Sequence, residues 1–154
     1  MPRPIQFQGS PQAVRARLNK ALLLPIPRAV SDELSLGAYL SLAGLHAGKG
    51  WIDGARRLTE VMLLASFISE AGYGPFEQEA LVKSDAAIAL VFQKGNESGV
   101  WELDDDAYAW FAAIVCLHDW QLRNAPMSVV AAASDRLDRI KAGEACQQPQ
   151  KKRA

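Results

Sequence analysis

The stretch from Asp104 to Asn124 constrains the fold more than any other part of the chain. It contains an unbroken apolar run of 11 residues, from Ala107 to Leu117. The aspartates Asp104 to Asp106 supply an N-cap and place negative charge at the positive end of a helix dipole. A membrane-spanning helix needs about 20 apolar residues. We therefore predict that this stretch forms a helix buried in a protein core.

Apolar residues recur along this predicted helix at steps of three and four, which marks one buried face. The residues of this face are Ala107, Phe111, Ile114, Leu117 and Leu122. Three more apolar side chains widen the face until they cover most of the circumference: Trp110, Val115 and Cys116. Such a helix is expected in the middle of a core. His118 lies beside the buried face, and Asp119 lies at its edge.

Caps, prolines, glycines and apolar periodicity predict five further helices, over about residues 11–24, 31–48, 53–71, 75–94 and 126–143. The predicted fold is all-α, a single-domain bundle of about six helices. Its domain organisation is a flexible N-terminal arm (1–9), a helical domain (10–143) and a disordered basic tail (144–154).

Each predicted helix has one apolar face that we expect to point inward. For the first helix these residues are Val14, Leu18, Ala21 and Leu22, and for the second they are Leu34, Ala38, Leu42 and Leu45. Ser31 is the predicted N-cap of the second helix, and the fourth is predicted to end at Lys94, before a turn at residues 95–99.

The composition bounds the compartment and the cofactors. Of the 154 residues 49% are hydrophobic, which argues against disorder. Cys116 and Cys146 are too few for a disulfide framework or a cysteine-based zinc site. We interpret Cys116 as a small core residue and Cys146 as a free thiol on the tail. No signal-peptide or membrane-span pattern occurs, so we expect a cytoplasmic protein with no membrane partner and no cofactor.

Net charge is zero, but the charges are unevenly distributed. Residues 1–30 carry +5 and residues 151–154 carry +3, which leaves −8 for residues 31–150. An acidic globule with basic ends can contact nucleic acid or an acidic partner, or the ends can be solvated tails. The candidate contact residues for a partner or nucleic acid are Arg15, Arg17, Lys20, Arg28, Lys151, Lys152 and Arg153.

The adjacent pair His118 and Asp119 is the clearest candidate polar site. Adjacent His-Asp on a helix is used by all-helical, metal-dependent phosphohydrolases of the HD superfamily, which require a further upstream histidine and a downstream aspartate. The only upstream histidine is His46, and the next downstream aspartate is Asp135. Both spacings are unusual for that family. We therefore predict no metal site, and expect the pair to fix helix packing through hydrogen bonds or to face a partner.

His46 opens a second candidate polar segment, His-Ala-Gly-Lys-Gly, at residues 46–50. It lacks the phosphate-loop pattern and follows a helix instead of a strand, so we interpret it as a helix end and turn. No nucleophile motif accompanies it. Cys116 and His118 stand two residues apart on a helix and cannot face each other. No catalytic residue is predicted.

A DNA-binding helix-turn-helix is a further hypothesis, with its turn at residues 71–75 or its reading helix at residues 126–141. The helix after the first turn opens with Glu77 and Glu79, which repel phosphates. The second carries Arg136, Arg139 and Lys141 at its C-terminal end, whereas base-reading residues usually lie near the N-terminal end. Neither segment is typical of the motif.

Four segments together resemble a known group of sequences: residues 40–50 (LSLAGLHAGKG), 58–74, 101–106 (WELDDD) and 117–122 (LHDWQL). Over about residues 34–140 the chain is similar to small helical proteins of proteobacterial plasmids and integrative elements, some of which carry the label of Fis-type transcriptional regulator. The resemblance implies a mobile-element setting, an accessory or regulatory role, and no reaction.

Together these observations predict a non-enzymatic protein that acts by binding a protein partner, a second copy of itself, or DNA through its basic ends. The alternative is a metal-dependent HD-type phosphohydrolase that uses His118 and Asp119.

Overall fold

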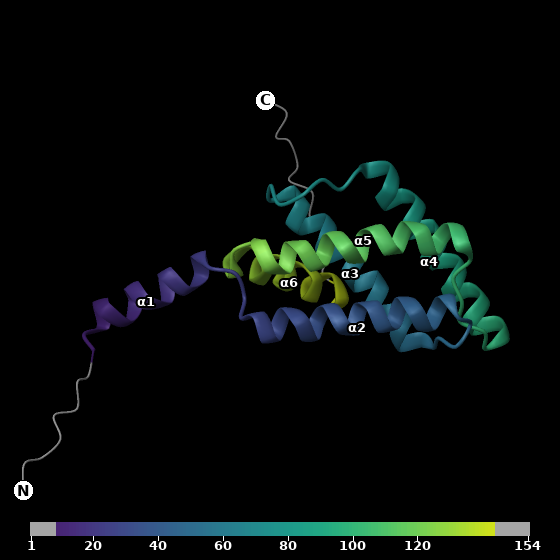
Figure 1. Cartoon of the computed structure of the whole chain (residues 1–154), viewed down its shortest axis with the longest axis horizontal. Coiled ribbons are helices and arrows are strands. Elements are labelled where there is room, and N and C mark those ends of the chain that lie inside the picture. The colour runs from purple at the N-terminus through teal and green to yellow at the C-terminus, as the bar shows by residue number, and fades with distance from the viewer. Residues whose placement is uncertain (1–8, 144–154) are drawn as a thin grey trace, which may run out of the picture.

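The computed structural model describes residues 9–143, and this range contains six helices and no strand (Figure 1). The helices are α1 (Pro11–Leu23), α2 (Arg28–His46), α3 (Ile52–Glu70), α4 (Gln78–Ser98), α5 (Asp105–Asn124) and α6 (Met127–Lys141). The predicted all-α helical bundle is confirmed. Predictions for residues 1–8 and 144–154 lie outside the described residues.

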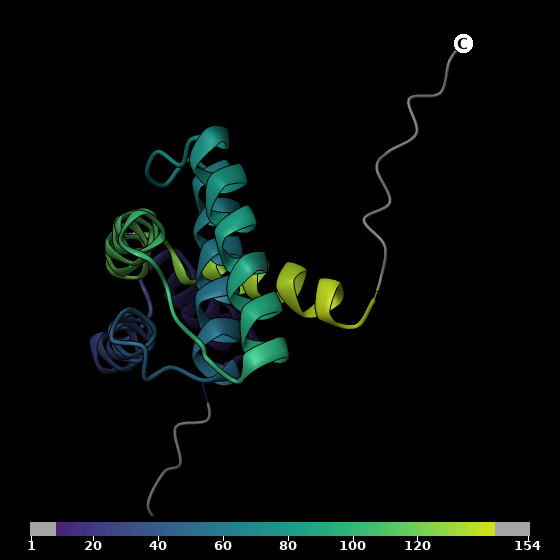
Figure 2. The ribbon, with the colours of Figure 1, turned by 90° about the vertical axis from the view of Figure 1, so that its right-hand side faces the viewer.

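The helices form two crossed layers. Helices α2 and α5 lie side by side and are seen end on in Figure 2, where α3 and α4 run across them. Helix α6 packs on α3. Since α3 contacts α2, α4, α5 and α6, it occupies the centre of the bundle, while α5 packs on α2, α3 and α4. The stretch singled out in the sequence is thus a core helix next to the most central one.

Helix α5 begins where the sequence predicts. The Asp104 carboxylate accepts a hydrogen bond from the Ala107 backbone N–H at 2.8 Å, which satisfies one of the free donors of the first turn. The buried face of α5 is centred on Phe111, which is 0% exposed, with Ile114 and Val115 beside it. The prediction that Cys116 is a core residue is wrong, because its side chain is exposed.

Three helix boundaries also differ from the prediction by three residues or more, one of them the start of α4, which is Gln78 and not residue 75. Helix α2 begins a turn earlier, at Arg28, so Ser31 is not a cap; its hydroxyl donates to the Arg28 carbonyl at 2.9 Å. Helix α4 continues through Gly95 to Ser98 and ends at Gly99, whose φ of 75° is left-handed. Gly95 lies inside this helix, and its lack of a side chain leaves the space that the indole ring of Trp101 fills.

The prediction for the inward face of α2 is partly wrong. Ala38, Leu42 and Leu45 are buried as predicted, but Leu34 is 50% exposed. The face continues toward the N-terminus through Ser35 and Ser31, which are both buried. These hydroxyls can be buried because each has a hydrogen-bond partner.

Gln121 joins the two layers inside the bundle. Its side chain is 0% exposed, and its amide Nε2 donates to the backbone carbonyls of Ala65 at 2.9 Å and Tyr73 at 3.0 Å. The Ala65 carbonyl belongs to α3 and the Tyr73 carbonyl to the loop after it, so Gln121 fixes α5 against both. None of the helices in the described range has the length and apolar character needed to cross a membrane.

Candidate functional site

Helix α1 projects from the bundle, beyond the end where α5 stops and α6 begins (Figure 1). Ser10 caps it, accepting from the Ala13 backbone N–H at 3.2 Å, and Pro11 occupies the first turn. Its packing partner is the neighbouring α6. None of the residues of α1 is buried. The prediction that its apolar face points inward is therefore wrong.

That face is an exposed stripe along two turns, which we call the α1 stripe (Val14, Leu18, Ala21 and Leu22). The exposed fractions are 48% for Val14, 61% for Leu18 and 40% for Leu22. At 3.6 residues per turn, Arg15 lies on one side of the stripe and Arg17 on the other. Lys20 lies on the opposite face. Since α1 contains no acidic residue, it is a basic amphipathic helix with its apolar side open.

The segment after α1 explains why it projects. Leu24 is extended, with φ −94° and ψ 155°, and Pro25 and Pro27 restrict the next residues to extended geometry. The Met127 backbone N–H donates to the Leu24 carbonyl at 2.7 Å, which anchors this connection to the start of α6. A short, stiff and anchored connection keeps α1 from folding back along the bundle.

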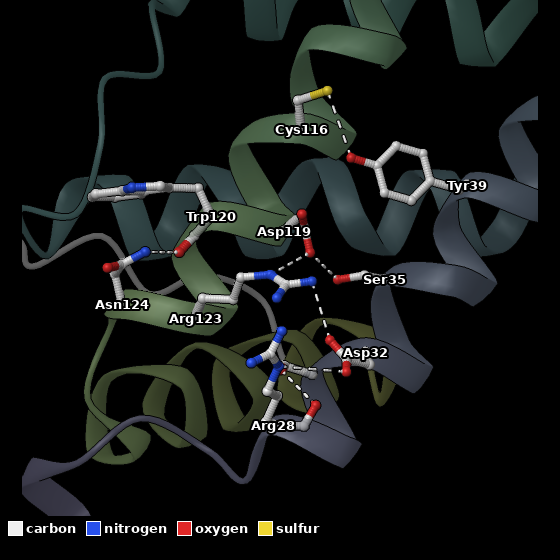
Figure 3. Close-up of polar contacts among 10 residues, drawn as sticks. Arg28, Asp32, Ser35, Tyr39, Cys116, Asp119, Trp120, Arg123 and Asn124 are labelled. Carbon is white, nitrogen blue, oxygen red and sulfur yellow. Dashed lines mark hydrogen bonds and ion pairs between the residues drawn. The ribbon is translucent and has the colours of Figure 1, made fainter.

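A polar network joins α2 to α5 beside this connection (Figure 3). Oδ1 of Asp119 accepts from the hydroxyl of Ser35 at 2.6 Å and from Nε of Arg123 at 3.1 Å. Arg123 also pairs with Asp32 at 3.1 Å, and Asp32 lies 3.9 Å from Arg28. Asp119 thus acts as an acceptor that fixes helix packing, in line with the structural interpretation of the sequence. Arg28, at the start of α2, is exposed.

The network shifts two pKa values. The hydrogen bond and charge of Asp119 raise the pKa of Arg123. Tyr39 donates to Sγ of Cys116 at 3.6 Å, and this bond, with partial burial, raises the pKa of Tyr39 to about 12. Tyr39 therefore stays protonated at neutral pH. The network holds α2 against α5 at the surface of the bundle.

His118 points into the bundle, away from this network, and is 4% exposed. Burial lowers the pKa of His118 to about 4, although Gln121 and Asp119 oppose the shift. The neutral ring is therefore the form present at pH 7. Its Nδ1 has no hydrogen-bond partner among residues 9–143, so the hydrogen bond that we predicted is not made by that atom.

His46, at the end of α2, lies far from His118 in the fold and near the start of α5. Its Nε2 is 3.0 Å from Oδ1 of Asp105, and its ring stacks on Tyr108 with 3.9 Å between centroids. This contact ties the C-terminus of α2 to the N-terminus of α5. The residues 46–50 form the helix end and turn that the sequence predicts.

The three candidate polar residues do not converge on one site, since Asp119, His118 and His46 have separate surroundings. Within residues 9–143, no group of three or more His, Cys, Asp or Glu side chains is placed to hold a metal ion. Two of the three basic residues of α6 are in ion pairs: Arg136 pairs with Glu70 at 2.7 Å, and Lys141 pairs with Glu60. Lys151, Lys152 and Arg153 lie outside the described residues.

The sequence interpretation missed the partners of Asp119. Arg123 follows it by four residues on the same helix, a spacing that predicts an ion pair. Ser35 and Asp32 are on another helix, more than 80 residues away along the chain, and no local pattern indicates them. Comparison with family models, curated proteins and solved structures found no match for this chain.

Proposed function

We propose that this protein is a non-enzymatic accessory or regulatory protein that acts by binding, and that α1 is the element that engages the partner. The observation that carries the proposal is the exposed α1 stripe between Arg15 and Arg17. Apolar side chains that remain open on a projecting helix are costly in water and gain free energy when a partner covers them. The resemblance of residues 34–140 suggests a mobile-element setting for this role.

A protein partner fits α1 better than DNA does. A helix that lies against a duplex gathers its basic side chains on the side that faces the phosphates. In α1, Arg15 and Arg17 flank the apolar stripe and Lys20 lies opposite it. This arrangement suits an apolar groove with an acidic rim on another protein, a recurrent mode of helix recognition.

Site-specific cross-linking in living cells tests this proposal. A photo-reactive amino acid replaces Leu18, in the stripe, and in a matched variant replaces Ala16, which is exposed on the opposite face of the same helix. We expect a defined protein cross-link from position 18 and little from position 16. Equal or no cross-linking at both positions would contradict a docking role for the stripe.

The DNA alternative has its own measurement. Fluorescence anisotropy with a short duplex compares the parent chain with an Arg15→Gln/Arg17→Gln variant over a range of salt concentrations. If DNA is the partner, affinity falls steeply with salt, and the variant has a smaller salt slope because it releases fewer counterions. We expect binding in the weak, non-specific range at physiological salt.

The phosphohydrolase alternative predicts stoichiometric metal in the purified protein, lost in both His118→Ala and Asp119→Asn. The burial of His118 and the engagement of Asp119 with Ser35 and Arg123 argue against it. Metal analysis and phosphoester turnover of the parent and the two variants decide the matter. We expect neither bound metal nor turnover.

A further inference from the structure

A cleft of about 820 Å³ lies between α4 and the start of α5. Its floor is apolar, with Leu90, Val91, Leu103 and Trp110 among the residues that line it. Leu90 is 64% exposed, so the floor is open to solvent. This volume is in the range of known ligand-binding clefts, which measure about 300–1,000 Å³.

The rim of the cleft is acidic. Four carboxylates line it against two lysines: Glu97, Glu102, Asp104 and Asp106 against Lys83 and Lys94. Both lysines have carboxylate partners, because Lys94 pairs with Glu102 at 2.9 Å and Lys83 with Glu79 at 2.7 Å. Among the described residues, no basic side chain forms an ion pair with the remaining three rim carboxylates. The cleft therefore has free negative charge around an apolar floor.

We propose that the α1 stripe of one copy of this chain docks into the α4–α5 cleft of a second copy. This inference rests on the proposed function, in which α1 is the docking element. The apolar side chains of the stripe cover the floor, and Arg15 and Arg17, on its two sides, face the carboxylates of the rim. The two surfaces are thus complementary in both polarity and charge.

The dimensions also agree. From Val14 to Leu22 the stripe extends about 12 Å, and from Lys83 to Glu97 the α4 wall extends about 21 Å, at 1.5 Å per residue. Within one chain the two surfaces lie at opposite ends of α5. Trp110 is about 21 Å along the helix from Asn124, near which the anchored connection holds α1 (Figure 1). A second copy is therefore the better source of the helix.

Charge selects this cleft over the other depression. A smaller hollow of about 340 Å³ lies between α2 and the start of α3, where Leu40 and Trp51 are exposed. Its charged lining residues are Lys49, Arg57 and Asp53, which give a net positive charge. Such a surface repels the arginines of α1. Leu40 is 63% exposed, almost the same as Leu90, so it provides a matched control.

Sedimentation velocity from about 1 to 200 µM tests this docking, because a single two-turn helix contact is small and gives affinities in the micromolar range. We expect the full chain to form a dimer or larger species that dissociates at high salt. Leu18→Glu, in the stripe, and Leu90→Lys, in the cleft, each weaken association at least about tenfold. Leu40→Lys leaves it unchanged. All three positions are exposed, and circular dichroism checks that each variant is folded.

A mixture of the two defective variants gives the decisive test of this docking. The Leu18→Glu chain keeps an intact cleft, and the Leu90→Lys chain keeps an intact α1. Each alone associates at least about tenfold more weakly than the parent, but together they form a one-to-one heterodimer through the one intact pair of surfaces. The heterodimer adds no further copy, because its unoccupied α1 and its unoccupied cleft both carry a disrupting substitution.

Three results overturn the inference. A parent chain that stays monomeric throughout the range removes self-docking, while a cross-link from position 18 to a different protein leaves the proposed function standing. A mixture of the two defective variants that fails to assemble shows that the stripe and the cleft do not pair with each other. Loss of association in Leu40→Lys, with Leu90→Lys unaffected, places the docking surface at the α2–α3 hollow.

Discussion

The hydroxyl of Ser35 donates to Oδ1 of Asp119 at 2.6 Å, which joins the buried face of α2 to the edge of α5. Ser35 is buried, so its hydroxyl is removed from water. Because its acceptor is ionised and only 25% exposed, the bond is stronger than one between neutral groups.

We predict that Ser35→Ala lowers the free energy of unfolding by about 1–2 kcal/mol, since it removes a hydrogen bond to a charged acceptor. The matched variant is Ser134→Ala, at an exposed position of α6, for which we expect a change within about 0.5 kcal/mol. Urea denaturation measures both. Similar values for the two variants would show that the Ser35–Asp119 bond contributes little.

Two glycines inside helices should respond in opposite directions to alanine. In Gly95→Ala the new methyl group overlaps the indole ring of Trp101, and we expect a loss of about 1–3 kcal/mol. In Gly44→Ala the methyl group meets no atom within 4 Å, and we expect a gain of about 0.5–1 kcal/mol from helix propensity. Thermal unfolding of both variants tests the packing of Trp101, which is misplaced if Gly95→Ala is also stabilising.

Phe111→Ala should lower the free energy of unfolding by about 3–5 kcal/mol, because it removes a fully buried ring and leaves a cavity. Val82→Ala, at a position of α4 that is 58% exposed, is the control and should cost less than about 0.5 kcal/mol. Chemical denaturation gives both values. A loss below about 1 kcal/mol at Phe111 would place α5 outside the core.

His118 should make the fold sensitive to acid. Its pKa is about 4 in the folded chain against an ordinary value of 6.5, so between these pH values the unfolded chain binds more protons. Stability therefore rises with pH from about 4 to 6.5 and is lost as the pH falls. From pH 7 to 4.5 we expect the parent to lose about 2 kcal/mol more than His118→Gln, measured by urea denaturation at each pH. Equal losses would mean that His118 titrates normally.

The sequence predicts helices well where the signals are local. The cap at Asp104 and the buried Phe111, Ile114 and Leu122 of α5 depend on neighbours a few residues apart, and all are confirmed. The boundary errors have local causes too. Gly95 is a residue type at which helices often end, and the sequence predicts the end of α4 there. In the structure Trp101 packs against Gly95, and α4 continues to Ser98.

Faces are predicted less well than helices, because burial depends on what other elements cover. Cys116 and Leu34 belong to apolar patterns, yet both are exposed, whereas the polar Ser35 is buried and joins α2 to α5 through its hydrogen bond to Asp119. The α1 stripe has the periodicity of a buried face, but the anchored connection at Leu24 directs it into solvent. Of the candidate site, the basic residues of α1 could be found from charge alone, whereas the projection of the helix and the α4–α5 cleft required the fold.

Amide hydrogen exchange of the full chain in dilute solution tests the central claim most directly, namely that α1 lies outside the core and presents an open face. We predict that amides of residues 15–23 exchange at least about a hundredfold faster than those in the middle of α5, because α1 opens without unfolding the bundle. Protection of α1 equal to that of α5, at a concentration where the chain is monomeric, would contradict the account.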